Sequence, residues 1–355
     1  MRITSSLKRF AILAAALSCA PAGAPPSPAT ARLAADPAVT ESDVRRILTA
    51  LAADSMEGRF TGSPGAKRAA EFIANEMKAI GLAPRGDSAF FQRIPFSART
   101  DTTGRRRLTL LDSMGALNAI PEPDRQISYN VIGVLPGSDP VLRDQVVVIG
   151  AHYDHLGIGA PVNGDSIYNG ADDDASGVTT VISVARALNQ GPPPKRTIVF
   201  MATTGEEQGI LGTRWYVRHP VLPIEKMVAD MEVEMIGRPD SMAGGAGKAW
   251  LTGYDRSTMG EMLKAAGIPI VADPYPQHRF FERSDNIVFA RMGIPAHTLS
   301  SFNLHADYHR PSDDVDKIDF AHMTAVINAA VKAARILSDG PAPQWKEGGR
   351  PAATR

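Results

Sequence analysis

Residues 197–209 read TIVFMATTGEEQG, and this stretch decides the fold class. Its first part, 197–202, is a mostly apolar run without alternating polar positions. Such a run is typical of a strand that is buried on both faces, as in parallel sheets. Two adjacent acids, Glu206 and Glu207, follow the strand after a short turn. The stretch therefore predicts a central strand with polar groups just beyond its carboxyl end.

The segments on either side continue an alternation of strands and helices. Before this stretch we expect strands at 131–135 and 145–150 and a helix at 175–188, and after it a helix at 210–217 and a strand at 226–235. This order predicts an α/β fold with an open, mostly parallel mixed β-sheet flanked by helices on both faces. Apolar residues at helical spacing predict further helices at 41–53, 66–80 and 320–337, whereas 87–128 reads as less regular.

Composition narrows the class of protein. The chain has 355 residues, and 44% of them are hydrophobic, which is enough for a sizeable core. Lys and Arg together number 38, as do Asp and Glu, so the charge balance favours neither nucleic acid nor a membrane surface as a partner. We expect a signal peptide and leader over 1–31, one main domain over 40–340 and a flexible tail over 341–355.

The first residues have the layout of an export signal. Arg2, Lys8 and Arg9 are positively charged, and residues 10–17 (FAILAAAL) are apolar. The apolar run is too short to span a bilayer, which favours a secretory signal over a membrane helix. The alternative is a buried amphipathic helix. We therefore expect a secreted or periplasmic protein.

Processing of this signal has two possible outcomes. The small residues at 29–31 fit a cleavage site, and those at 22–24 are a second candidate. Cys19, the single cysteine of the chain, lies inside the segment. It could carry a lipid anchor in a bacterial lipoprotein. In either case the mature chain has no disulfide.

Metal-binding side chains follow the first of the central strands. Ligands of open α/β sheets bind beyond the carboxyl ends of the strands. The strand at 145–150 runs into His152 and Asp154, which share one face if the chain stays extended. A metal-bound imidazole usually donates its second N–H to a carboxylate, which Asp154 could supply. Taken alone, such a pair is more typical of a protein surface.

Acids at the next chain segments extend the pattern. Residues 172–174 are three consecutive aspartates before a helix, where carboxylates cap free N–H groups. Capping accounts for one or two of them, but the mutual repulsion of three favours a nearby cation. Of Glu206 and Glu207, one can bind a metal while the other acts as a base, although both could instead occupy the first turn of a helix.

Two further positions complete the set of candidate ligands. In the strand at 226–235, Asp230, Glu232 and Glu234 alternate with apolar residues, and only Glu234 lies at the carboxyl end. The alternative is that all three face solvent on an edge strand. His309 lies shortly before Pro311, which favours a loop. Histidine and carboxylates at successive strand ends together predict a metal site.

The sequence resembles the co-catalytic, two-zinc exopeptidases typified by bacterial leucyl aminopeptidases and glutamate carboxypeptidase, with glutaminyl cyclases as relatives. The resemblance covers about 44–337. Its motifs are GAHYDHLG (150–157), NGADDDASG (169–177), TTGEEQGILG (203–212), EMIGRPD (234–240) and DYHRPSDD (307–314), in the order of the family. Two weaker matches are MEGRFTGSPG (56–65) and YNVIGVLPG (129–137).

The resemblance implies a catalytic domain that holds two Zn²⁺ and hydrolyses peptides. Glu206 would be the general base and acid, Asp154 would orient His152, and Tyr308 would donate to the developing oxyanion. The family most often has Asp where this chain has Glu234. The implied zinc ligands are His152 and Glu234 for one ion, Glu207 and His309 for the other, and Asp173 as the bridge.

Several functions remain open at this point. An aminopeptidase is the preferred interpretation, with a carboxypeptidase, a glutaminyl cyclase-like acyltransferase, an inactive binding module and a calcium site as alternatives. Manganese or cobalt could replace zinc. A carboxypeptidase for acidic substrates would need arginines in the pocket, for which Arg279, Arg283 and Arg310 are candidates. We expect Arg279 and Arg283 to be surface residues of a loop at 274–285. Phe280, Phe281 and Phe302 could line a pocket or belong to the core.

Overall fold

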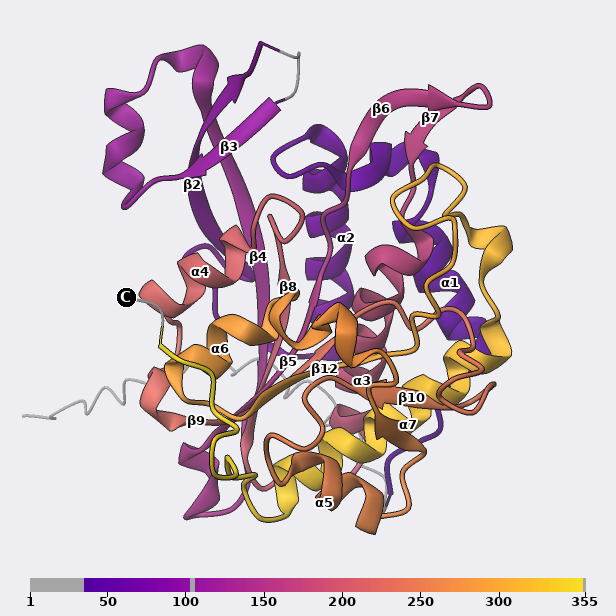
Figure 1. Cartoon of the computed structure of the whole chain (residues 1–355). Helices are drawn as coiled ribbons and strands as arrows, with labels where there is room; N and C mark the ends of the chain where they lie inside the picture. The colour runs from indigo at the N-terminus through magenta and orange to yellow at the C-terminus, as the bar shows by residue number, and fades with distance from the viewer. Residues whose placement is uncertain (1–34, 103–105, 354–355) are drawn as a thin grey trace, which may run out of the picture. The chain divides into compact units, whose positions relative to one another are not determined.

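The computed structural model describes residues 35–102 and 106–353. The predicted signal, its cleavage sites and Cys19 lie outside these residues. In the described part, a ten-stranded mixed sheet forms the centre of one compact unit (Figure 1). Its strands are β1 (Ala83–Pro84), β2 (Phe91–Thr100), β3 (Arg106–Leu110), β4 (Arg125–Leu135), β5 (Val146–His152), β8 (Thr197–Thr203), β9 (Met227–Val233), β10 (Ala249–Leu251), β11 (Ile270–Ala272) and β12 (Ala296–Ser300).

The sheet is parallel at its centre and has antiparallel pairs on both sides. The strand order is β11-β10-β12-β9-β5-β8-β4-β2-β3, and β1 pairs with β4. Strands β12, β9, β5 and β8 run parallel to one another, so their carboxyl ends meet at one edge. A separate hairpin joins β6 (Gly157–Val162) to β7 (Asp165–Tyr168). The predicted α/β fold with a mixed sheet is confirmed.

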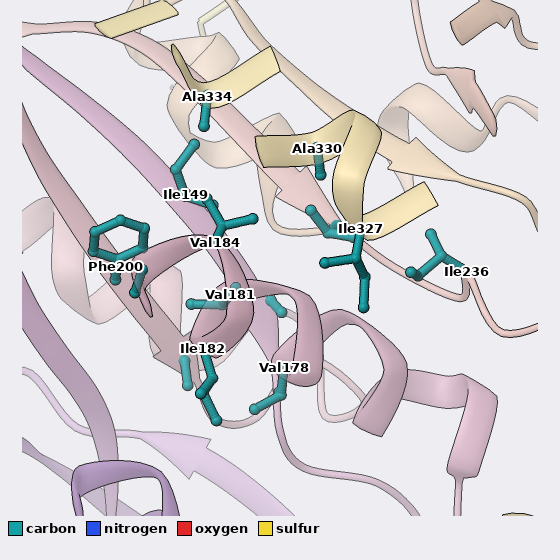
Figure 2. Close-up of a cluster of buried hydrophobic side chains, with 14 of the residues drawn as sticks. Ile149, Val178, Val181, Ile182, Val184, Phe200, Ile236, Ile327, Ala330 and Ala334 are labelled. Carbon is teal, nitrogen blue, oxygen red and sulfur yellow. The ribbon is translucent and has the colours of Figure 1, made fainter. Parts of the chain in front are cut away.

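Helices cover both faces of the sheet, as the alternating side chains of β5 illustrate. Val147 and Ile149 pack in the larger core, and Val146 and Val148 pack in the smaller core on the other face. Figure 2 shows Ile149 in the larger core, between two of its helices. The larger core is covered by α1 (Glu41–Leu51), α2 (Pro64–Ile80), α3 (Gly177–Gln190), α5 (Met259–Ala265) and α7 (Phe320–Asp339), and the smaller core by α4 (Leu211–Arg218) and α6 (Asn286–Met292).

The ends of α2 show how local sequence sets an element. The Ser63 side chain accepts a hydrogen bond from the backbone N–H of Ala66, and Pro64 occupies the first turn. Gly81 ends the helix with a φ of 93°, a left-handed conformation that glycine adopts without strain. No helix of the described residues is long and apolar enough to cross a membrane.

Two expectations differ from the structure. The segment 87–128 is more regular than expected, because β2 and β4 pair along their length and bury polar residues such as Gln92 together with apolar ones. The segment after Gly340 differs from the expected flexible tail, because it packs on the domain as far as Gly349, whose backbone oxygen accepts from the Arg256 side chain at 3.0 Å. There the Trp345 indole N–H donates to the carbonyl oxygen of Gly293, and its ring contacts the smaller core.

Candidate metal centre

The carboxyl ends of the parallel strands bring the predicted ligands together. His152 ends β5, Glu207 follows β8, and Glu234 directly follows β9. In the described residues, two groups of side chains place their ligand atoms within 4.8 Å of one another. One group is His152, Asp173 and Glu234, and the other is His155, Asp173 and Glu207. Asp173 belongs to both groups, so its carboxylate lies between two adjacent sets of donors.

The loop before α3 fixes Asp173. Asp313 accepts hydrogen bonds from the backbone N–H groups of Asp172 and Asp173, at 3.1 and 3.0 Å. The carboxylate of Asp173 is 3.4 Å from Nε2 of His152 through one oxygen and 3.1 Å from Nε2 of His309 through the other. A single carboxylate thus reaches an imidazole on each side.

A third imidazole lies beside the second group of donors. His155 is fully buried, and its Nδ1 is 2.8 Å from Oε1 of Glu207. Nε2 of His309 is 3.3 Å from the same oxygen, and the two rings contact edge to face. The sequence interpretation included His309 but not His155. The available signal was its place in HYDH, three residues after His152.

The imidazoles keep the shared carboxylates ionised. Burial would raise the pKa of Asp173, but His155, His152 and His309 hold it well below its usual range. Burial and Asp173 would likewise raise the pKa of Glu207, but hydrogen bonds to His155 and His309 lower it to about 2. Carboxylates that are already deprotonated can bind a metal ion directly, and the nearby imidazoles can release their protons when the ion binds.

Glu206 differs from its neighbour in its electrostatic environment. Burial raises the pKa of Glu206 well above its usual range, and although His152 opposes this shift, Glu234 and Glu207 add to it. Burial also raises the pKa of Glu234, to about 7, again against the influence of His152. A carboxyl group that readily holds a proton has the property required of a general base and acid.

Asp154 contacts both His152 and Glu206, although in a different way from the one expected. Nδ1 of His152 hydrogen-bonds the backbone oxygen of Asp154 at 3.1 Å, while the carboxylate oxygen Oδ1 is 3.9 Å away. The Asp154 carboxylate accepts instead from the backbone N–H of Glu206 at 3.1 Å and from the Thr61 hydroxyl at 2.9 Å. Asp154 thereby holds the backbone of Glu206 next to His152.

The other two aspartates of the triplet have structural partners. Asp174 accepts from the backbone N–H of Gly177 at 2.9 Å, as expected of a cap, and also from that of Met235 at 3.0 Å. Asp172 accepts from the backbone N–H of Gly237 at 2.7 Å and pairs with His305 at 3.0 Å. Both aspartates therefore tie the loop before α3 to the segment that carries Glu234.

Arg59 fastens the same loop from the other side. Its side chain is fully buried, and its guanidinium donates to backbone oxygens of Leu51, Tyr153, Asn169 and Gly170 at 2.5–2.8 Å. A guanidinium that is removed from water needs such partners. Sequence reasoning assigned no role to Arg59, although it lies in one of the weaker motifs, because its four acceptors are backbone groups distributed along the chain.

A cavity adjoins the metal-ligand candidates and is lined in part by Glu206, Glu207 and Glu234. Tyr308 lines it, and its ring stacks on that of His309 with centroids 3.8 Å apart. Arg283 also lines the cavity, whereas Arg279 lines a separate one and Arg310 lines neither. Both loop arginines are exposed, as expected, and Arg283 in addition contributes to the lining of the cavity. Among the predicted pocket phenylalanines, Phe280 and Phe302 line the cavity and Phe281 packs in the smaller core.

The donor set fits zinc better than calcium. Imidazole nitrogen and carboxylate oxygen are zinc ligands, whereas calcium prefers oxygen alone. Nε2 of His155 is buried without a hydrogen-bond partner in the described residues, whereas Nε2 of His152 and Nδ1 of His155 face carboxylate oxygens of Asp173 and Glu207 at 3.4 and 2.8 Å. Buried imidazole nitrogens that lack partners or face carboxylates are suited to coordinate a metal ion.

Comparison with known proteins agrees with this fold and donor set. A model of Peptidase family M28 matches residues 130–334, which is more than half of the 355 residues. The chain therefore belongs to Peptidase family M28. This finding confirms the resemblance to the zinc exopeptidases, and zinc is the metal implied by the family.

Curated relatives and solved structures extend the comparison. The chain is 31% identical over 178 residues to "Probable leucine aminopeptidase 2" of Aspergillus fumigatus, covering 49% of this chain and 33% of the relative. It is 25% identical over 281 residues to "Leucine aminopeptidase 2" of Trichophyton rubrum, covering 70% of this chain and 54% of the relative. The chain thus spans a third to about half the length of these relatives.

Two solved structures share the fold at low sequence identity. The zinc aminopeptidase BSAP of Bacillus subtilis aligns with a TM-score of 0.65 and 15% identity, over 84% of this chain and 96% of its own. A glutaminyl cyclase of Porphyromonas gingivalis aligns with a TM-score of 0.56 and 15% identity, over 83% of this chain and 97% of its own. Because an aminopeptidase and a cyclase both match, the fold alone does not select the reaction.

Proposed function

We propose that this chain is a zinc-dependent aminopeptidase that hydrolyses the N-terminal residue from peptides. The observation that carries the proposal is the position of Asp173 between two groups of metal donors, with Glu206 beside them. Two adjacent metal ions of this kind clamp the reacting atoms of hydrolytic reactions. The names of the curated relatives support the same activity.

The proposed zinc sites follow from the two donor groups. His152 and Glu234 would hold one ion, Glu207 and His309 would hold the other, and Asp173 would be shared between them. His155 is a further donor to the second site, since its Nδ1 lies 2.8 Å from Glu207. Glu234 is one methylene longer than the Asp that is usual in the family, and its place directly after β9 lets its carboxylate reach the group.

The remaining residues carry the chemistry of proton transfer. Zinc ions, when bound, polarise the scissile carbonyl and lower the pKa of an attacking water. Glu206 accepts the proton of that water and delivers it to the leaving amine, which its raised pKa favours. Asp154 holds the Glu206 backbone in place. The Tyr308 hydroxyl donates to the oxyanion that develops on the substrate.

The first test is hydrolysis of aminoacyl-p-nitroanilides and dipeptides, including an N-acetylated dipeptide, with and without added zinc. Cleavage that needs a free α-amine and is abolished by a chelator supports the proposal. Cleavage of the N-acetylated substrate instead indicates a carboxypeptidase, and cyclisation of an N-terminal Gln indicates a glutaminyl cyclase. If the zinc-loaded protein is inactive on all of these substrates, the result indicates a binding module without catalytic activity.

Metal analysis tests the number of ions separately from activity. We expect about two zinc ions per chain, because Asp173 is shared by two donor groups. A measured content of one zinc ion per chain would contradict the bridging role of Asp173. Calcium in place of zinc would contradict the peptidase proposal. Activity measurements after reconstitution with manganese or cobalt show whether another metal can substitute.

We propose in addition that residues 1–31 direct export of the chain to the periplasm or beyond. The support is the positively charged start followed by an apolar run in the sequence. Cell fractionation of a bacterium that expresses the full chain tests this, with N-terminal sequencing of the product to locate the cleavage. Membrane association that disappears in Cys19→Ser would instead indicate a lipid anchor.

A further inference from the structure

The cavity beside the metal centre has one wall without metal donors. Trp250, Phe280 and Phe302 contribute aromatic rings to this wall. Trp250 and Phe280 are stacked with centroids 5.4 Å apart, and Phe302 contacts Phe280 edge to face at 5.9 Å. Stacked rings that fix one another make this wall rigid and apolar.

The hydroxyl groups of the same wall are already engaged. Thr298 donates to the side-chain oxygen of Asn286 at 3.0 Å, and the Thr252 hydroxyl accepts from the backbone N–H of Thr298 at 2.8 Å. Ser300 donates to the backbone oxygen of Met235 at 3.2 Å. Their principal contacts are thus within the protein, and they contribute little selectivity for a charged ligand.

Arg283 is the one arginine or lysine among the described residues that line this cavity. Its guanidinium lies over the ring of Phe280, 5.1 Å from the centroid, and it forms no ion pair with any described residue. The neighbouring acid, Glu282, pairs with Arg279 instead. A guanidinium held over an aromatic face, with no carboxylate of its own, is available to a ligand.

The backbone around Arg283 is anchored on both sides. Phe281 is buried in the smaller core, and its carbonyl oxygen accepts from the Asn286 side chain at 3.1 Å. Asp285 is fully buried and accepts from the Thr203 hydroxyl at 2.7 Å. The side chain therefore projects from a fixed segment.

We infer that Arg283 binds a carboxylate of the substrate, so that the enzyme prefers substrates with an acidic group at the residue that occupies this cavity. Guanidinium and carboxylate form paired, charge-assisted hydrogen bonds, and the apolar wall would strengthen them by excluding water. The carboxylate can come from an acidic side chain or from the C-terminus of a short peptide. This inference rests on the proposed function, because it names the substrate class of the same site.

The experiment compares matched substrate pairs with the zinc-loaded full chain. Glu- and Gln-p-nitroanilide test the side-chain carboxylate, and Leu-Leu and Leu-Leu-amide test the C-terminal carboxylate. Each pair is measured with the wild type, Arg283→Met, Arg283→Lys and the control Arg279→Met. Arg279 lies four residues earlier in the same loop and outside the cavity. Thermal unfolding verifies that each variant is folded.

We expect Arg283→Met to lower kcat/KM for the carboxylate member of one pair by roughly 10- to 100-fold, which is the usual range for a hydrogen-bonded charge. Its neutral partner and the Arg279→Met variant should change little, and Arg283→Lys should fall between. The pair that responds identifies the source of the carboxylate. Equal losses on both members of each pair, or none, overturn the inference while leaving the peptidase intact.

A failure of the proposed function gives a different result. If no variant hydrolyses any substrate, the peptidase proposal fails, but the binding site is still tested by calorimetry with glutamate and with glutamine. Tighter binding of glutamate that is lost in Arg283→Met supports the carboxylate site. Affinities for glutamate and glutamine that are both unchanged in Arg283→Met overturn it, because both ligands carry an α-carboxylate and only glutamate has a second one.

Discussion

Strand β9 carries two kinds of buried acid, and their surroundings differ. Glu234, directly after the strand, reaches His152 and Asp173 at the edge where the parallel strands end. Asp230 and Glu232, inside the strand, are fully buried, and neither carboxyl group has a hydrogen-bond partner among the described residues. All three acids occupy the same side of the alternating strand.

The acids inside the strand lie among other acids, and neither belongs to a group of metal-ligand candidates in the described residues. Burial raises the pKa of Asp230 and of Glu232 well above the usual range, and the nearby Asp285 adds to both shifts. Glu232 also packs against Gly150 of β5, where a Cβ would lie 2.3 Å from its Oε2. The difference between these acids shows that burial of an acid alone does not create a metal site. A metal site also needs histidine donors and a position at a strand end beside a cavity.

The largest expected effect concerns turnover. In Glu206→Gln the side chain keeps its shape but cannot accept a proton, so we expect kcat to fall roughly 100- to 10,000-fold. Zinc content should remain unchanged, because Glu206 is outside both donor groups. The matched control is Glu232→Gln, an identical change at a buried acid of β9. If both variants lost kcat equally, the distinction between the two sets of acids would disappear.

The next effect concerns metal binding. Asp173→Ala removes the carboxylate that both donor groups share, so we expect the affinity for both zinc ions to fall. The fall should exceed the roughly 10- to 100-fold that removal of a residue supporting a metal ligand costs. Mass spectrometry of metal content and chelator competition measure it. Asp230→Asn is the control and should retain the zinc content of the wild type. Normal zinc binding by Asp173→Ala would exclude the bridging role.

A smaller effect is expected at His155. His155→Ala should lower the affinity for one of the two zinc ions by about 10- to 100-fold and leave the affinity for the other unchanged, because His155 contacts Glu207 and not Glu234. Competition with a chromogenic chelator resolves the two affinities. His297→Gln serves as the control, because His297 is equally buried but bonds Ser257 and Thr252. Two unchanged affinities would show that His155 only packs beside the site.

The last effect leaves the metal site and concerns the dependence of stability on pH, measured on the metal-free protein. The pKa of Asp230 is raised in the folded state, so the folded protein holds a proton that the unfolded chain releases above about pH 4. The free energy of unfolding therefore falls as the pH rises from there toward the folded-state pKa.

Asp230→Asn cannot release that proton. Between pH 5 and pH 8 its stability relative to the wild type should increase by up to about 1.4 kcal/mol per pH unit, the value for one proton. Urea unfolding at both pH values gives the difference. A difference that is the same at pH 5 and pH 8 would mean that Asp230 titrates normally.

The central strands and every member of the two donor groups except His155 are predictable from the sequence and its family resemblance. The groups at the strand ends are predictable for a physical reason. Strand 197–203 is recognisable from its apolar run, and the groups after parallel strands meet at one edge by topology alone. The sequence alone therefore places Glu206 and Glu207 at that edge. The long strands β2 and β4 are not predictable in the same way, because their antiparallel pairing buries polar side chains that read as a loop.

The residues that sequence reasoning missed act through partners far away in the chain. His155 was not selected because its partner, Glu207, is 52 residues away and the pair has no fixed spacing. Asp313 hydrogen-bonds backbone N–H groups 140 and 141 residues away. Of the three candidate pocket arginines, only the structure singles out Arg283, because neither the loop nor its composition specifies the cavity. Such contacts depend on tertiary packing, which no local pattern encodes.

The buried guanidinium of Arg59 has a consequence for the order in which the protein folds. Its four acceptors lie at the end of α1, after β5 and in the loop that carries Asp173, so they can be satisfied only when all three segments have assembled. We expect these segments to open as one cooperative unit, with similar protection of their amides in native-state hydrogen exchange. The metal-binding loop would then be among the last parts of the domain to mature.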